Sequence, residues 1–317
     1  MRWTIAGSPY SITLCELFHK ASGLIAPTPP DLRSLLRDLY SAATAAVAPG
    51  AALAARLGNL PLDRERPPWI IALGKAALPM ARAAVDLLAA RGTQPAGGLV
   101  VAPAPAESPH PALGYIRGDH PEPGAGSLAA AIALASTAAR VTGEDEVWVL
   151  LSGGTTSLIG APEPGLTPQE LSNLYSLLLG SGLDITAMNR IRKRFSRWGG
   201  GKLAQALAPA RVRVYVVSDV IGDDLASIGS GPCVPDPTTA GEVHRLLEAA
   251  ELWTRIPEAA RTMVAAVEAG VLPETPKPGH RMFERVTLEL IAGNRLALEA
   301  AAERALPVPI QANQDVR

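Results

Sequence analysis

Residues 69–92 of the chain are WIIALGKAALPMARAAVDLLAARG, and this stretch decides the fold. Residues 69–73 are five consecutive apolar residues, which is typical of a short strand buried on both faces. Gly74 then provides a turn, and Lys75 opens a helix that should run to about Arg91. The stretch therefore predicts one strand–turn–helix unit of a parallel sheet.

The same unit recurs along the chain, with short apolar runs at 97–102, 146–151, 213–217 and 286–291 and helical patterns between them. Residues 31–47 predict an amphipathic helix that begins at Asp31 and is closed by Pro49-Gly50. Ser127 and Thr167 are expected to cap two further helices, and a proline-rich loop should follow residue 102. Buried strands alternating with helices predict an α/β fold with a parallel, Rossmann-like sheet flanked by helices on both faces, an αβα sandwich.

Composition narrows the function classes. Of 317 residues, 48% are hydrophobic and 19% charged, which excludes wholesale disorder. Lys and Arg total 29 against 30 for Asp and Glu, so no basic excess supports nucleic-acid binding. No apolar run is long enough to span a membrane, and Cys15 and Cys233 cannot form a disulfide framework. We expect a cytoplasmic protein without membrane or nucleic-acid partners, and a homodimer is left open.

The expected domain organisation is simple. Residues 1–30 end in the run APTPP and are expected to form a loosely attached leader. Residues 31–306 should form one α/β domain. Residues 307–317 show no clear pattern and are expected to be a tail.

Two of the expected strands end in residues that suit an anion. Lys75 follows a buried strand directly and stands on the first turn of a helix, where the backbone amides also favour a phosphate. The alternative interpretation is a solvated lysine at the start of a helix. A second strand continues into a loop with two glycines and several hydroxyls, which can turn backbone amides toward a phosphate or form an ordinary glycine turn. The candidate phosphate-binding residues of this loop are Ser152, Gly153, Gly154, Thr155 and Thr156.

Carboxylates follow a third strand. Asp219, Asp223 and Asp224 come directly after the apolar run 213–217. Their mutual repulsion must be offset, and a divalent cation bound by Asp219 and Asp223 is one means. Asp219 can instead act as a base toward a substrate hydroxyl, and Asp223 or Asp224 can simply cap a helix.

A basic segment, residues 189–194 with the sequence NRIRKR, is the fourth candidate. It is either a solvated helix face or a grip for a carboxylate or phosphate, and Arg192 is the candidate within it. His120 is placed either to brace its turn or to touch a ligand, and Cys233 is interpreted as inert packing. Together, a helix-start lysine, a glycine-rich hydroxyl loop and an acidic strand end suggest phosphoryl transfer.

At these residues the chain resembles the glycerate 2-kinases of the DUF4147 plus MOFRL type, often labelled hydroxypyruvate reductases. The matching segments are ALGKAALPMARAA (72–84), GDHPEPGAGSLAAA (118–131), LSGGTTSL (151–158), GSGLDITAMNRIRKRFS (180–196), GGKLA (200–204) and SDVIGDDLASIGSGPCVPDPTT (218–239). The resemblance implies ATP- and Mg²⁺-dependent phosphorylation of the C2 hydroxyl of D-glycerate, with the active site in a cleft between two domains. It implies that Lys75 and Asp219 are catalytic and that Asn189 and Arg192 lie near the substrate.

The chain departs from the family pattern in three places. Gly199-Gly200-Gly201 stands where Lys-Gly-Gly is usual, and Thr155-Thr156-Ser157 stands where Gly-Ser-Ala is usual. The match covers residues 31–306, so the C-terminal domain of the family is expected to be missing. A catalytically impaired relic or ligand-binding module is therefore one alternative to the kinase. An NAD(P)H-dependent hydroxypyruvate reductase is the other, although no strand is followed by GxGxxG.

Overall fold

The computed structural model describes residues 29–305 of the chain. The described residues divide into two compact units, one formed by residues 46–297 and the other containing residues 29–45 and 298–305. The leader expected at 1–30 and the tail expected at 307–317 lie outside the described residues, except that Pro29 and Pro30 belong to the first described helix. The extent of a single α/β domain over 31–306 stays a prediction.

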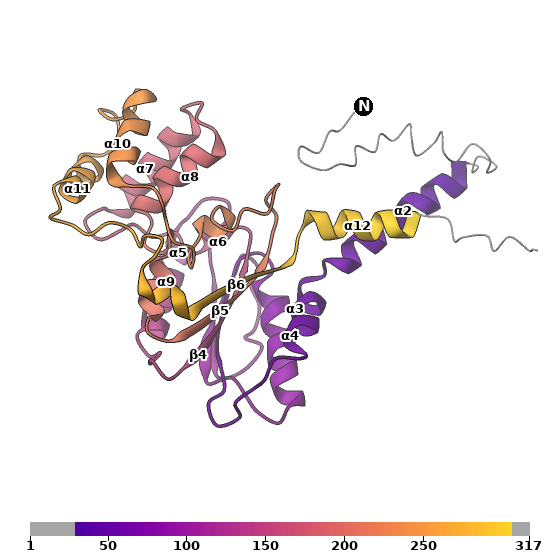
Figure 1. Ribbon diagram of the computed structural model, residues 1–317. Coiled ribbons are helices and arrows are strands. Elements are labelled where there is room, and N and C mark those ends of the chain that lie inside the picture. The colour runs from indigo at the N-terminus through magenta and orange to yellow at the C-terminus, as the bar shows by residue number, and fades with distance from the viewer. Residues whose placement is uncertain (1–28, 306–317) are drawn as a thin grey trace, which may run out of the picture. The chain divides into compact units, whose positions relative to one another are not determined.

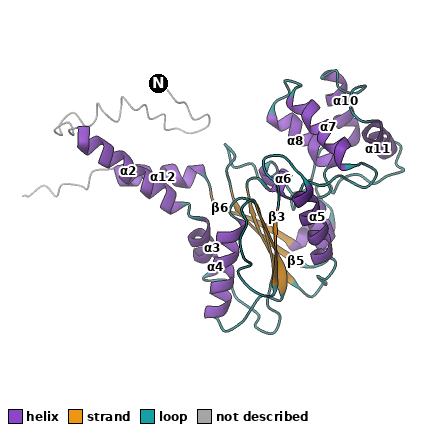
Figure 2. Cartoon of the chain, turned by 180° about the vertical axis from the view of Figure 1, so that it is seen from behind, coloured by secondary structure: helices purple, strands orange, loops and turns teal. Residues whose placement is uncertain are grey.

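The larger unit is built on a six-stranded sheet in the order β3-β2-β1-β4-β5-β6, seen edge-on in Figure 2. All neighbouring strands pair in parallel. This confirms the predicted Rossmann-like sheet, and the order is that of the dinucleotide-binding folds. The strands are β1 (Trp69–Leu73), β2 (Gly97–Ala102), β3 (Leu113–Arg117), β4 (Glu146–Ser152), β5 (Arg211–Val217) and β6 (Val286–Ala292).

Helices cover both faces of the sheet, because alternate residues of each strand point to opposite sides. Ile70 of β1 belongs to one apolar cluster, with α3 (Pro49–Leu57) and α4 (Ala77–Ala90). Ile71 belongs to the other, with α5 (Ala125–Ala138) and α9 (Lys202–Leu207). Every residue of β1 is buried, as its apolar sequence predicts.

A third apolar cluster joins four helices that lie together in Figure 1: α7 (Pro168–Leu179), α8 (Ile185–Phe195), α10 (Ala240–Ala249) and α11 (Glu258–Glu268). Thr167 caps α7 as predicted, since its hydroxyl accepts a hydrogen bond from the Glu170 amide and the Glu170 carboxylate accepts one from the Thr167 amide at 2.7 Å. The Thr167 amide and hydroxyl both donate hydrogen bonds to the Glu170 carboxylate, and these two bonds lower the pKa of that carboxyl.

Three short elements complete the larger unit: α6 (Thr155–Leu158) and the 3₁₀ helices η1 (Ile228–Ser230) and η2 (Arg281–Arg285). Two more helices extend into the smaller unit, α2 (Pro29–Ala46) and α12 (Asn294–Ala305). Within that unit Arg304 and Asp38 form an ion pair at 3.6 Å. No helix among residues 29–305 is long and apolar enough to cross a membrane.

Three local expectations are corrected. Strand β3 lies where a proline-rich loop was expected, because an edge strand with only Leu113 fully buried shows no apolar run. Pro49-Gly50 begins α3 instead of closing the preceding helix, since proline is well suited to the first helical turn. Helix α5 begins at Ala125, before Ser127, and the Asp119 carboxylate accepts hydrogen bonds from the Gly126 and Ser127 amides.

Candidate functional site

The candidate site lies where the strand order reverses. Strands β1 and β4 are neighbours, and the chain leaves their carboxyl ends in loops that touch each other. The Lys75 amide donates to the Gly153 carbonyl at 2.9 Å, and the Ala76 amide donates to the Ser152 hydroxyl at 2.9 Å. In open α/β sheets this switch point is where ligands bind.

Gly74 makes this close approach possible. Its φ is +116°, and a Cβ atom there would lie 2.2 Å from the Ser152 hydroxyl oxygen. Any side chain would therefore force the loops after β1 and β4 apart.

The structure brings Lys75 and Asp219 together. The Lys75 ammonium lies 3.3 Å from the Asp219 carboxylate, which follows the end of β5. The two side chains are 52% and 49% exposed, so both groups can reach a ligand. An ion pair this exposed contributes little to stability, roughly 0–1 kcal/mol. A bound anion or cation can therefore replace one partner at small cost.

Gly153 supports the Asp219 carboxylate. A Cβ atom at position 153 would lie 1.9 Å from an Asp219 carboxylate oxygen, so the carboxylate packs directly on the glycine backbone. The glycine loop thus fixes the position of the acid as well as the course of the chain.

We expect Gly153→Ala to lower the rate of the phosphoryl transfer that the sequence predicts by about 100-fold, because the new methyl group must displace Asp219 by an ångström or more. Steady-state kinetics together with thermal melting should show lost activity without unfolding. Gly180→Ala is the matched control, since its Cβ would meet no atom closer than 3.7 Å. Equal turnover in Gly153→Ala and the wild type would contradict this role.

The loop after β4 presents free backbone amides. Gly154 has a φ of +84°, and the amides of residues 153–156 donate to no acceptor among residues 29–305. The hydroxyl groups of the loop are already engaged: Thr155 donates to the Ser152 carbonyl at 2.8 Å, and Thr156 shares a hydrogen bond with Ser230 at 2.9 Å. Successive free amides form a concave donor surface that suits an oxyanion.

Two further residues border this loop. The His120 ring stands beside Gly154, where a Cβ atom would lie 3.0 Å from the ring and 3.2 Å from the Lys75 side chain. Ser230 is 1% exposed and has a φ of +64°, a conformation that costs energy and is often kept at functional sites. The sequence singled out His120 without assigning it and missed Ser230, whose only signal is its place between two glycines.

The aspartates that follow Asp219 in the loop after β5 have different surroundings. The Asp224 carboxylate accepts hydrogen bonds from the Ala226 amide at 3.1 Å and the Ser227 hydroxyl at 2.5 Å, so it caps a turn. Asp223 has a φ of +54°, and one of its carboxylate oxygens is enclosed without a hydrogen-bond partner. That carboxylate packs against Gly293, where a Cβ atom would lie 2.7 Å away.

A cavity of about 400 Å³ adjoins these residues and is lined by Val47, Val217, Ser218, Asp219, Val220, Ile221, Gly293, Asn294 and Ala297. Within residues 29–305 no group of three or more His, Cys, Asp or Glu side chains is arranged to hold a metal. Mg²⁺, however, is commonly bound by one or two carboxylates together with substrate phosphates. Asp219 and the unpartnered oxygen of Asp223 fit that kind of site, and the metal role of both stays a prediction.

Asn189 and Arg192 lie on α8, where the sequence placed them near a substrate. The Arg192 guanidinium stacks 5.1 Å from the centre of the Tyr175 ring, and its Nε is enclosed without a partner. Burial lowers the pKa of Arg192 and raises that of Tyr175 to about 12. Among residues 29–305 no hydrogen bond links Asn189 or Arg192 to the Lys75–Asp219 pair, and their substrate role stays a prediction.

The burial of Cys233 is consistent with its interpretation as an inert residue of the core. It is 1% exposed, and burial raises the pKa of its thiol to about 12. A thiol held protonated in this way is a poor nucleophile and a poor metal ligand.

The fold defines an open, parallel α/β protein with a candidate ligand-binding site at the carboxyl ends of its strands. The chain belongs to the family described as "Domain of unknown function (DUF4147)", whose pattern matches residues 35–265.

Relatives extend the comparison. A glycerate 2-kinase of Pyrococcus horikoshii is 36% identical over 237 residues, which are 75% of this chain and 52% of the relative. A D-glycerate 2-kinase of Thermotoga maritima is 33% identical over 78% of this chain and 56% of its own length. A putative hydroxypyruvate reductase of Agrobacterium vitis is 35% identical over 86% and 59%. The chain thus spans about half the length of the curated relatives it matches.

Solved structures agree with the fold. The crystal structure of a glycerate kinase from Thermotoga maritima superposes with a TM-score of 0.76 at 31% identity, over 87% of this chain and 63% of that one. A crystal structure from Pyrococcus horikoshii gives 0.75 at 32% identity, over 89% and 64%. Both comparisons confirm the predicted α/β class.

Proposed function

We propose that this chain carries the site of a glycerate 2-kinase, which transfers the γ-phosphoryl group of ATP to the C2 hydroxyl of D-glycerate and yields 2-phosphoglycerate. The observation that carries the proposal is the Lys75–Asp219 pair at 3.3 Å, beside a loop whose backbone amides are free. The relatives named as glycerate 2-kinases support this reaction over other phosphoryl transfers.

Each part of the site has a role in this reaction. The Lys75 ammonium and the amides of residues 153–156 neutralise the phosphoryl oxygens, and Asp219 orients the attacking hydroxyl and accepts its proton. Asp219 and Asp223 would hold Mg²⁺, which would supply further positive charge to neutralise the phosphate oxygens. Asn189 and Arg192 are proposed to face the substrate. Catalysis of this kind rests mainly on positioning, which the rigid strand ends provide.

Two alternatives remain distinguishable. The relative named as a putative hydroxypyruvate reductase raises a hydride-transfer reaction. The turn after β1, however, has a single glycine at Gly74, whereas dinucleotide-binding turns use three. A ligand-binding module without turnover is the second alternative.

The purified chain incubated with ATP, Mg²⁺ and D-glycerate should form ADP and 2-phosphoglycerate in equal amounts, as measured by a coupled assay and mass spectrometry of the product. A parallel reaction with NADH and hydroxypyruvate should show no loss of NADH absorbance. Steady NADH oxidation would support the reductase. Binding of ATP without any product would support the ligand-binding module.

A further inference from the structure

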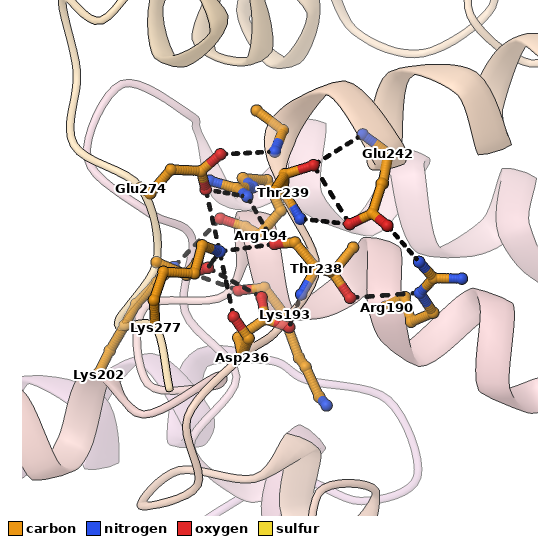
Figure 3. Close-up of polar contacts among 12 residues, drawn as sticks. Arg190, Lys193, Arg194, Lys202, Asp236, Thr238, Thr239, Glu242, Glu274 and Lys277 are labelled. Carbon is orange, nitrogen blue, oxygen red and sulfur yellow. Dashed lines mark hydrogen bonds and ion pairs between the residues drawn. The ribbon is translucent and has the colours of Figure 1, made fainter. Parts of the chain in front are cut away.

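Helix α8 carries four cations within five positions, and three of them have evident partners. Figure 3 shows those of Arg190 and Arg194. Arg190 donates to the Thr238 hydroxyl at 3.2 Å and pairs with Glu242 at 3.6 Å. Arg194 pairs with Glu274 at 2.5 Å, and Arg192 stacks on an aromatic ring. These contacts tie α8 to its neighbouring helices.

Lys193 is different. The residue is only 6% exposed, yet its ammonium forms no hydrogen bond or ion pair with any residue of 29–305. In Figure 3 its side chain leads away from the network of dashed lines, and no dashed line reaches its nitrogen. Burial lowers the pKa of the Lys193 ammonium, and the nearby carboxylates of Asp236 and Asp224 offset this only in part. An unpaired ammonium in such a place opposes folding.

Lys202 shows what a structural buried lysine looks like in the same region. Its ammonium lies 2.9 Å from the Glu163 carboxylate and 2.7–3.2 Å from three backbone carbonyl oxygens at the end of α8. Asp236, one of the two carboxylates whose charge acts on Lys193, already accepts hydrogen bonds from the Thr238 amide and the Thr275 hydroxyl. The fold therefore satisfies one buried lysine fully and leaves the other without a partner.

The surroundings of Lys193 connect it to the site. A Cβ atom added at Gly199 would lie 3.5 Å from the Lys193 Cα and 3.2 Å from the Ser230 Cβ, and one added at Gly200 would lie 3.4 Å from the Lys193 Cβ. Ser230 in turn shares a hydrogen bond with Thr156 of the glycine loop. The Lys193 ammonium is not among the fully enclosed polar atoms that lack a partner, so its tip keeps an opening to solvent.

We propose that Lys193 binds an oxyanion of the ligand, a carboxylate or a phosphate, on the side of the site bordered by η1 and Asp224. A bound oxyanion would give the Lys193 ammonium the hydrogen-bond partner that it lacks among the described residues. A charge-assisted hydrogen bond at a site shielded from water is strong. This proposal rests on the proposed function for the identity of the ligand, because D-glycerate offers a carboxylate and ATP offers phosphates.

The test is anion binding to the full chain, measured by calorimetry with inorganic phosphate and with D-glycerate separately. Lys193→Met should weaken binding of at least one probe by about tenfold to a hundredfold, and the affected probe identifies the oxyanion. Lys193→Arg keeps the charge and should bind more tightly than Lys193→Met. Arg190→Met is the matched control, since it removes a cation from the same helix and should change neither affinity.

Thermal melting separates this role from a structural one. Methionine replaces an unpaired buried charge by an apolar chain of similar length, so the Tm of Lys193→Met should stay unchanged or rise by about 1–3 °C. Weaker anion binding with an unchanged or raised Tm supports the proposal. Unchanged binding of both probes, or a loss of binding that only accompanies a lowered Tm, overturns it. Neither probe requires turnover, so an inactive chain would refute the proposed kinase without deciding the role of Lys193.

Discussion

Lys75→Met and Asp219→Asn should each lower the rate of phosphoryl transfer to D-glycerate by about 10²–10⁴-fold. In the proposed mechanism, the lysine variant removes the cation nearest the transferring phosphoryl group, and the asparagine variant removes the charge that orients the attacking hydroxyl. The two side chains form an exposed ion pair, so neither change should unfold the protein. Steady-state kinetics with thermal melting measure both effects.

Two variants on α4 provide the matched controls. Arg82→Met and Asp86→Asn remove the same charges from exposed positions of the helix that follows Lys75. Both should retain full activity. If Lys75→Met or Asp219→Asn retained activity within a factor of about three of these controls, the roles assigned to the pair would be wrong.

The largest effect on stability should come from Lys202→Met. The Lys202 side chain is 12% exposed and pairs with Glu163, while its ammonium also caps the last carbonyl oxygens of α8. Removing it leaves a carboxylate and three carbonyl groups without their partner, which costs about 3–5 kcal/mol of unfolding free energy. Denaturant unfolding followed by circular dichroism measures this loss.

Arg66→Met is the control for that prediction. Arg66 and Glu144 form an ion pair at 2.5 Å, but the side chains are 59% and 79% exposed. Losing a surface pair of this kind should cost less than about 1 kcal/mol. Comparable losses in Lys202→Met and Arg66→Met would contradict the special role of the buried lysine.

The central strands and the helices around them were predictable from the sequence because burial on both faces leaves a continuous apolar run. Strand β1 is the clearest case, with five buried residues followed by a glycine turn. Edge strand β3 was not predictable, since its residues beyond Leu113 are partly or fully exposed and include Arg117. Pro49 was misinterpreted as a helix end because proline also suits a helix beginning.

The candidate site followed from the sequence to the extent that it depends on strand ends. Ser152 is the last residue of β4, and Lys75 and Asp219 each lie two residues beyond the end of a strand. Parallel pairing brings such positions to one edge of the sheet. The α8 cations could not be sorted in the same way. Arg190 and Arg194 form ion pairs, whereas Arg192 stacks on a ring and Lys193 has no partner among the described residues. Which cation is paired depends on the elements that pack against each side of the helix, and a run of basic residues does not predict that packing.

A crystal structure of the chain with a non-hydrolysable ATP analogue and Mg²⁺ tests the central claim most directly. We expect the γ-phosphate at about 3 Å from the Lys75 ammonium and from the amides of residues 153–156. The Asp219 carboxylate should lie on the side of the γ-phosphate from which the hydroxyl attacks, opposite the β-phosphate. A triphosphate bound elsewhere on the sheet, with the Lys75–Asp219 pair untouched, would contradict the account.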